Sequence, residues 1–197
     1  MQDENPFTPE YFEQLYASDP DPWDFETSEY ERAKYRHTLS ELPHPRFRRA
    51  LEVGCANGAL TVDLAPRCDR LIAVDVVESV LKRGRDRCAD QRHVEFHNMR
   101  VPRQTPDGPF DLILLSEVAC YWDDADLAGV AQYLCRATED DGHVLLVHYT
   151  EETGYPKTAD EAVETLRDLV GNHFNTLKTE RPLHYRLDLW QRVAQSR

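Results

Sequence analysis

The chain has 197 residues, 41% of them apolar, and a net charge of −13, which fits one α/β domain with a sizeable core. Such an acidic chain argues against a nucleic-acid binder, and no apolar run approaches the ~18 residues that span a bilayer. The acidic start MQDENPF lacks the basic and apolar regions of a signal peptide. We therefore expect a cytoplasmic protein without a membrane span, a nucleic-acid partner or an obligate protein partner.

The five cysteines show no C-x-x-C spacing, and their number is odd. Neither a disulfide framework nor a zinc site is indicated by this pattern. We expect reduced thiols packed as small apolar side chains, and no bound metal.

The first 45 residues differ from the rest because they hold six of the twelve prolines and many aromatic side chains. Pro9 is placed to start a short helix through Tyr16, and the run SDPDPW is typical of a turn-rich loop. Ser28 can N-cap a second helix that ends near Leu42, before Pro43. We treat residues 1–45 as an N-terminal helical segment and residues 46–197 as the main part of a single domain.

From residue 46 onward, apolar strand patterns alternate with helical patterns. The predicted strands are 50–54, 71–76, 93–99, 110–118, 143–149, 176–181 and 185–193, and the predicted helices are 58–65, 78–88, 126–136 and 159–170. This alternation predicts a Rossmann-like, doubly wound and mostly parallel seven-stranded sheet, closed by an antiparallel last strand. The most apolar strand, 110–118, is expected at its centre, and the residues DDG before 143 are expected to form a turn.

Two glycines lie where the first predicted strand turns into a helix. Gly54 lets a ligand approach the backbone, and Gly58 leaves the first N–H groups of the helix accessible. Asp75 ends the second strand, 17 residues after Gly58, and an acid there can accept both hydroxyls of a ribose. Glycines and acid together indicate an adenosine-type ligand, although a turn without a ligand remains open for the glycines alone.

The spacing G-x-x-x-G is not the G-x-G-x-x-G of dinucleotide binders, and no basic residue in the turn meets a phosphate. A nicotinamide oxidoreductase is therefore disfavoured. An adenosine ligand without phosphate fits better, and S-adenosylmethionine is such a ligand.

At these residues the sequence resembles the class I S-adenosylmethionine-dependent methyltransferases, whose first motif is acid-x-G-x-G-x-G. Here the motif stands as EVGCANG, with Ala56 in place of the middle glycine, and we expect a negative φ at that alanine. Three stretches, DPWDFETSEYERAKY (21–35), LEVGCANG (51–58) and VHYTEETGYPKTADEA (147–162), resemble the NodS family. That family is named for methyltransferases that N-methylate the deacetylated end of a chitooligosaccharide.

The resemblance implies cofactor-binding residues on the glycine turn, on the next strand ends and on the N-terminal segment. They are Arg32, Glu52, Gly54, Cys55, Ala56, Gly58, Asp75, Val76, Asn98, Met99, Ser116 and Val118. In this assignment Asp75 holds the ribose, Glu52 lies near the methionine amine, and Arg32 binds the methionine carboxylate through a bidentate fork.

On the acceptor side, the fifth strand places His148 near the carboxyl edge of the sheet as the first candidate base. Glu117 is the second candidate, or it orients the acceptor amine. Aromatic and acidic side chains complete the acceptor cleft, with the N-terminal segment as a lid. They are Trp23, Tyr30, Tyr35, Tyr121, Trp122, Asp123 and Tyr149, with Tyr155 as a further candidate.

The leading hypothesis is thus methyl transfer from S-adenosylmethionine to the nitrogen of an amino sugar or similar small molecule or oligosaccharide, with S-adenosylhomocysteine as product. A small-molecule O-methyltransferase is the nearest alternative. A non-catalytic module that only binds S-adenosylmethionine is the more distant one.

Overall fold

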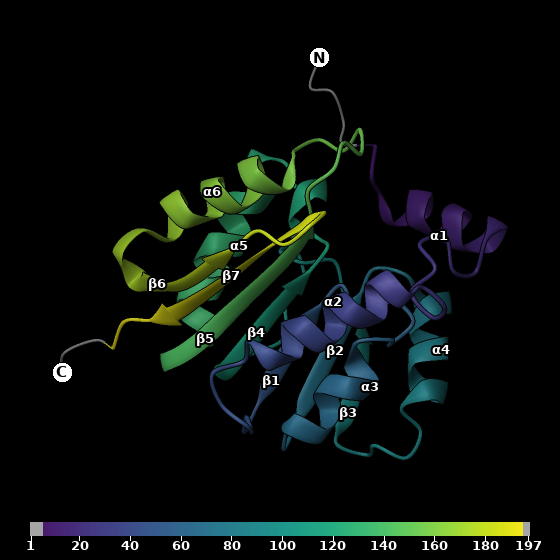
Figure 1. Cartoon of the computed structure of the whole chain (residues 1–197), viewed down its shortest axis with the longest axis horizontal. Coiled ribbons are helices and arrows are strands. Elements are labelled where there is room, and N and C mark those ends of the chain that lie inside the picture. Colours follow the sequence, from purple (N-terminus) through teal and green to yellow (C-terminus); the bar gives the residue numbers. More distant parts are fainter. Residues whose placement is uncertain (1–5, 195–197) are drawn as a thin grey trace.

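Short apolar runs rich in Val, Ile and Leu form a seven-stranded sheet with strand order β3-β2-β1-β4-β5-β7-β6 (Figure 1). The structure is a computed structural model that describes residues 6–194. The strands are β1 (Ala50–Val53), β2 (Leu71–Asp75), β3 (Val94–Asn98), β4 (Phe110–Ser116), β5 (Thr138–Tyr149), β6 (Phe174–Glu180) and β7 (Tyr185–Arg192). The strands β1 to β5 pair in parallel, and β7 runs antiparallel to both β5 and β6. This confirms the predicted fold class and the central place of β4.

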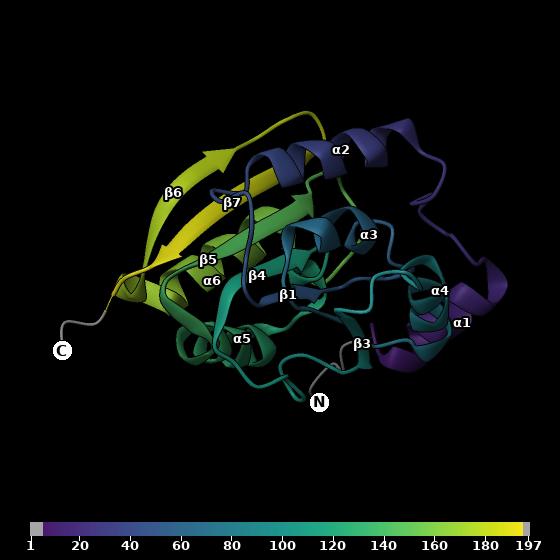
Figure 2. The same ribbon diagram turned by 90° about the horizontal axis from the view of Figure 1, so that it is seen from below.

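The helices cover both faces of the sheet. They are α1 (Pro9–Ser18), α2 (Glu29–Ser40), α3 (Thr61–Leu64), α4 (Glu78–Arg87), α5 (Asp124–Ala137) and α6 (Ala159–Val170). Figure 2 shows α2 and α3 on one face and α5 and α6 on the other. Ser28 caps α2 as predicted, because its hydroxyl accepts the N–H of Glu31. Within residues 6–194, no helix is long and apolar enough to cross a bilayer.

Two element boundaries differ from the prediction by three residues or more. The helix expected from residue 58 begins only at Thr61, since Gly58 still has a positive φ of 77°. The residues DDG, expected as a turn, lie inside β5, which starts at Thr138. There the pairing with β4 shifts register and Asp141 has a φ of 62°, so the chain changes direction through an irregularity in the strand.

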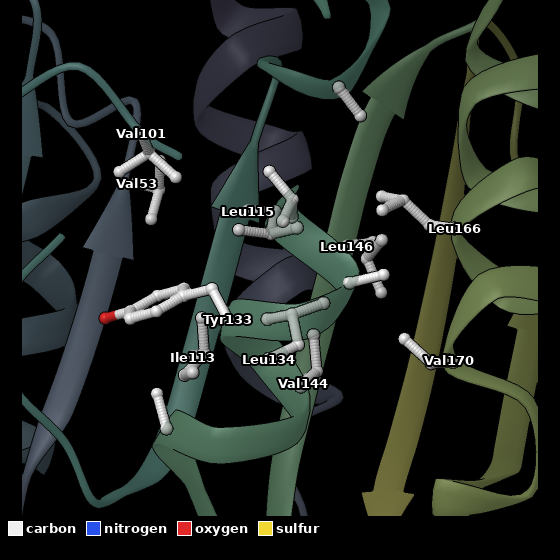
Figure 3. Packing of buried hydrophobic residues seen from close by; sticks show 14 of the residues in the cluster. Val53, Val101, Ile113, Leu115, Tyr133, Leu134, Val144, Leu146, Leu166 and Val170 are labelled. Atoms are coloured by element: carbon white, nitrogen blue, oxygen red, sulfur yellow. The ribbon is translucent and has the colours of Figure 1, made fainter. Parts of the chain in front are cut away.

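The apolar core fills both faces because successive strand side chains point to opposite sides. Ile113 and Leu115 of β4 pack toward α5 and α6, together with Leu146 of β5 and Leu166 of α6 (Figure 3). Leu114, between them in sequence, joins the cluster on the α2 side. The central strand is therefore buried on both faces, which explains its unbroken apolar run.

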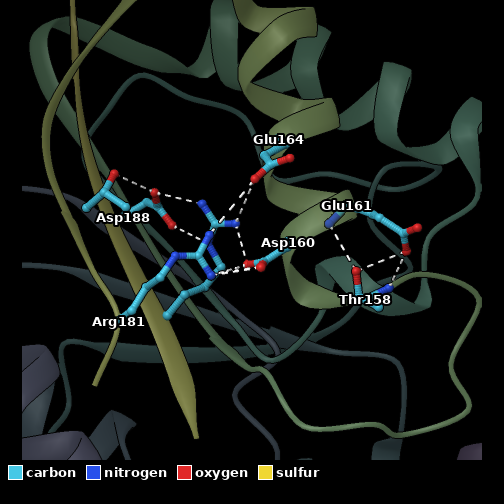
Figure 4. A network of polar contacts seen from close by, with 8 residues as sticks. Thr158, Asp160, Glu161, Glu164, Arg181 and Asp188 are labelled. Atoms are coloured by element: carbon cyan, nitrogen blue, oxygen red, sulfur yellow. Dashed lines mark hydrogen bonds and ion pairs between the residues drawn. The ribbon is translucent and has the colours of Figure 1, made fainter. Parts of the chain in front are cut away.

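Charged residues fix α6 and the β6–β7 hairpin in place (Figure 4). A capping box between Thr158 and Glu161 starts the helix. Asp160, in its first turn, pairs with Arg181 and with Arg186, both at 2.7 Å. None of these residues lines the cavity described next, so this network serves the fold.

Candidate active site

A cavity of about 550 Å³ lies at the carboxyl ends of β1, β2 and β4. The strand order reverses between β1 and β4, and open parallel sheets bind their ligands at such a switch point. The other walls come from α1, α2 and the loops after β4 and β5. A second chamber of about 20 Å³ shares Gly54, Ala56 and Glu117 with the main cavity.

Gly54 forms part of the cavity wall, and only glycine fits there. Its φ is 85°, and a Cβ would lie 2.4 Å from Val118 Cγ1 and 2.5 Å from the backbone oxygen of Ser116. Gly58 has a different reason for being glycine, because a Cβ there would lie 2.9 Å from the Cα of Gly84 in α4. Gly58 does not line the cavity, so its expected contact with a ligand is not supported by its position.

The expectation of a negative φ at Ala56 is wrong, because the angle is 45°. The N–H of Ala56 donates to Asp75 Oδ2 at 3.0 Å, and this bond holds the turn in the left-handed conformation. An L-residue other than Gly pays roughly 1–2 kcal/mol for that conformation. Ala56 still lines the cavity.

Asp75 lines the cavity at the end of β2. Its second oxygen, Oδ1, accepts the N–H of Val77 at 3.1 Å, so the carboxylate also orders the backbone on both sides of the site. Burial raises the pKa of Asp75, and the backbone donors offset part of that effect. Val76 and Met99 line the same wall, whereas Asn98 is exposed and donates to the backbone oxygen of Asp75 instead.

Glu52 lies at the base of the second chamber and is fully buried. Neither of its carboxylate oxygens finds a hydrogen-bond partner of normal geometry within the described part of the chain. Burial raises its pKa to about 7, and the nearby Thr61 hydroxyl opposes the rise. Cys55 and Tyr35 line this chamber rather than the main cavity, so Tyr35 is not in the acceptor cleft where we expected it.

Two cationic side chains of the described residues line the cavity, Lys34 and Arg100, and Arg32 is not one of them. Arg32 is exposed, does not line the cavity, and donates to the backbone oxygens of Glu26 and Thr27. The predicted contact of Arg32 with a cofactor carboxylate is therefore wrong.

Lys34 is buried, and its Nζ lies 2.9 Å from Glu31 Oε1 and 2.6 Å from Glu117 Oε1. Burial by itself would lower the pKa of Lys34, but Glu117 and Glu31 outweigh this effect and the pKa is raised. Lys34 is therefore charged at any physiological pH.

Glu117 follows β4 in a left-handed conformation, with φ at 56°. This turns its side chain back over the sheet edge, where Oε2 accepts the N–H of Tyr149 at 2.7 Å. Ser116, Val118 and Tyr149 line the cavity beside it. A carboxylate fixed at both oxygens and 22% exposed is well placed to accept a proton from a ligand in the cavity.

The prediction of His148 as first candidate base is wrong. Its side chain is fully buried, and it does not line the cavity. Its Nε2 accepts the N–H of Ala119 at 3.1 Å, so the ring is neutral with its proton on Nδ1, and burial lowers its pKa to about 4. His148 therefore holds the backbone of the loop after β4 in place through this hydrogen bond.

Aromatic side chains line the cavity. Of the residues expected there, the cavity is lined by Trp23, Tyr30, Tyr121, Trp122 and Tyr149, and also by Tyr155. Asp123 does not line it, because its carboxylate caps α5 by accepting the N–H of Asp126 at 2.8 Å. A helix cap thus accounts for the acid that we assigned to the acceptor.

Some wall residues were not predicted as site residues. They include Phe12 and Tyr16 of α1, Phe7 just before that helix, and Glu31 of α2. Burial, followed by the charge of Asp75, raises the pKa of Tyr16, and both residues line the cavity. The aromatic content of residues 1–45 was the available signal for α1.

A group of possible metal ligands lies elsewhere, where α2 meets β6. Among residues 6–194, His37, Glu41 and Glu180 bring their ligand atoms within 4.8 Å of one another. Lys178 pairs with both carboxylates, so a protein cation already matches their charge. The group does not line the cavity.

The chain is similar to known proteins in both sequence and fold. A family profile described as Nodulation protein S (NodS) matches residues 10–155. Nodulation protein S of Rhizobium tropici is 35% identical over 64% of this chain and 53% of its own length. The Bradyrhizobium diazoefficiens protein of the same name is 38% identical over 51% of this chain and 49% of its own length. The chain thus spans about half the length of the curated relatives it matches.

Solved structures show the same fold. A candidate methyltransferase from Pseudomonas syringae is 36% identical and has a TM-score of 0.73 over 84% of this chain and 100% of that chain. The N-methyltransferase NodS from Bradyrhizobium japonicum WM9, in complex with S-adenosylhomocysteine, is 20% identical with a TM-score of 0.82, over 96% of this chain and 99% of that chain. On the profile match, the chain belongs to the NodS (Nodulation protein S) family.

Proposed function

We propose that this protein is an S-adenosylmethionine-dependent methyltransferase that methylates the amine of an amino sugar or a related small amine. The main support is that Gly54, which has no side chain, and the Asp75 carboxylate both line a cavity of about 550 Å³ at the switch point of the sheet. The family match, residues 10–155, includes both residues. The NodS structure with bound S-adenosylhomocysteine supports the choice of cofactor.

The residues present fit this cofactor. S-adenosylmethionine supplies a methyl group activated on a sulfonium. Asp75 would hold the ribose, Val76 and Met99 would lie along the adenine, and Gly54 and Ser116 would lie beside the methionine part. All five line the cavity.

We assign to Glu117 the role of accepting the proton from the ammonium group of the methyl acceptor. An amine attacks only when unprotonated, and Glu117 accepts the proton that its ammonium form loses. Tyr121, Trp122 and Tyr149 offer aromatic faces suited to a sugar ring. Holding the acceptor in line with the methyl group supplies several kcal/mol, up to about 7–11 in ideal cases. Residues 1–45, through α1 and α2, would act as the lid that excludes water.

Mass spectrometry of products tests the proposal, with glucosamine, a deacetylated chitooligosaccharide and their N-acetylated forms as acceptors. We expect methyl transfer to the free amines only. Equal methylation of the N-acetylated forms would refute the amine and indicate O-methylation. Binding of S-adenosylhomocysteine without turnover on any acceptor would indicate a module that only binds the cofactor.

Variants of two glutamates test the proton acceptor. Glu117→Gln should lower turnover about a hundredfold or more, the range of general-base catalysis, with little change in cofactor affinity. Glu152→Gln is the matched control, since Glu152 is exposed in the loop after β5. Equal turnover of the two variants would remove Glu117 from the mechanism.

A further inference from the structure

α2 brings a carboxylate, Glu31, to the cavity that the proposed methyl transfer does not use. Glu31 lines the cavity, as Lys34 and Glu117 do. The Lys34 ammonium lies between the two carboxylates, at 2.9 Å from Glu31 and 2.6 Å from Glu117. One ammonium facing two carboxylates leaves the cluster one positive charge short when all three groups are ionised.

Within this cluster, the carboxylate oxygen that lacks a hydrogen-bond partner is Oε2 of Glu31. Glu31 is only 7% exposed, and its Oε1 accepts from Lys34. Its Oε2 is buried without a hydrogen-bond partner among residues 6–194. The Tyr35 hydroxyl, on the side of the second chamber, lowers the pKa of Glu31 as a weak hydrogen-bond donor, but it makes no hydrogen bond of normal geometry to Oε2. A buried carboxylate oxygen without a donor is costly to fold, so its retention at a cavity wall indicates that a ligand supplies the donor.

The surroundings select a cation over a neutral donor. Burial raises the pKa of Glu31, and the charge of Lys34 opposes the rise, so a further positive charge beside Glu31 would stabilise its ionised form. The hydroxyl of Tyr30, which also lines the cavity, is likewise buried with no partner in the described residues. The Lys34 Nζ lies 5.4 Å from the centroid of the Tyr30 ring, so Tyr30, Glu31 and Lys34 of α2 form one continuous part of the cavity wall.

We propose that Glu31, positioned by Lys34, binds a primary ammonium group inside the cavity. The inference rests on the proposed function, because two ammonium groups would meet this wall: that of the acceptor and the α-ammonium of the cofactor. A charge-assisted hydrogen bond to a buried carboxylate is about twice as strong as a neutral one. The site therefore favours an amine over an isosteric alcohol, and α2 contributes to specificity as well as covering the cavity.

Calorimetry with matched variants and matched ligands tests the site. Glu31→Gln keeps the shape of the side chain and removes its charge. Glu29→Gln, an exposed position in the same turn, is the control. One arm titrates S-adenosylhomocysteine and its desamino analogue, and the other titrates glucosamine and N-acetylglucosamine into protein saturated with S-adenosylhomocysteine.

We expect Glu31→Gln to weaken binding of the ammonium ligand about tenfold or more in one arm, while its neutral counterpart is unaffected. The affected arm tells which ammonium the site holds. Glu29→Gln should bind every ligand as the wild type does. A general structural defect would weaken charged and neutral ligands alike, and that result overturns the proposal.

The two proposals fail in different ways. A wild type that does not bind S-adenosylhomocysteine refutes the proposed function. Intact cofactor binding without an ammonium-selective loss in either arm refutes only the Glu31 site. Should Glu31→Gln not fold, the affinities of the wild type still test the inference. If the wild type binds the charged and the neutral ligand of both pairs equally well, the inference is overturned.

Discussion

Ala56 is strained, and replacing it with glycine should stabilise the protein. Its φ is 45°, where an L-residue pays roughly 1–2 kcal/mol and glycine pays none. The greater freedom of glycine in the unfolded chain returns about 0.4–1 kcal/mol of that gain. We therefore expect Ala56→Gly to raise the free energy of unfolding by about 0.5–1 kcal/mol, which is roughly 1–4 °C in melting temperature for a chain of this size.

The assay is urea unfolding together with scanning calorimetry, and the control is the same substitution in a helix. Ala33 is exposed in the interior of α2, where Ala→Gly should cost about 0.8–1 kcal/mol. The two variants should thus shift stability in opposite directions. If Ala56→Gly is destabilised as much as Ala33→Gly, the strain argument is wrong. Affinity for S-adenosylhomocysteine should survive the change, because the N–H that donates to Asp75 remains.

Three further substitutions test the site. Asp75→Ala should weaken S-adenosylhomocysteine binding by at least ~1 kcal/mol in calorimetry and also lower stability, because the N–H groups of Ala56 and Val77 lose their acceptor; unchanged affinity would exclude the ribose role. Neutral His148 stabilises the fold above its unfolded pKa of 6.5, and this stabilisation is lost as pH falls toward the folded pKa of about 4. His148→Gln should therefore reduce the pH dependence of the unfolding free energy across that window by up to about 3 kcal/mol and leave turnover intact. A loss of turnover would restore His148 as a candidate base. The pKa of Glu52 is raised from 4.5 to about 7, so its ionisation lowers stability as pH rises from 4.5 through 7. Above pH 7, Glu52→Gln should be more stable than the wild type by up to about 3 kcal/mol. A difference in unfolding free energy that persisted below pH 4.5 would contradict this account.

The sheet and its ligand edge could be predicted from local patterns. Runs of Val, Ile and Leu, broken by Gly54 and ended by Asp75, define strands whose carboxyl ends must meet at one edge of a parallel sheet. The aromatic content of the first 45 residues likewise indicated the cover over that edge. The sheet prediction succeeded because it depends on residues close together in the sequence.

The choice among chemically similar side chains could not be predicted in this way. Arg32 and Lys34 are two residues apart on α2, and about 100° of rotation per residue sends them to nearly opposite sides of the helix. Only the docking of α2 on the sheet turned Lys34 inward. His148 and Tyr149 point to opposite faces of β5, and the packing of the loop after β4 decided that the histidine is the buried one.

The sequence by itself determined the sheet, the backbone opening at Gly54 and the carboxylate at Asp75, because strand propensity, a missing Cβ and a strand-end acid are local properties. Tertiary structure alone decided the sign of φ at Ala56, the pairing of Lys34 with Glu31 and Glu117, and the withdrawal of His148 from the cavity. Those features depend on partners far apart in the chain, which come within hydrogen-bonding distance only after the elements pack.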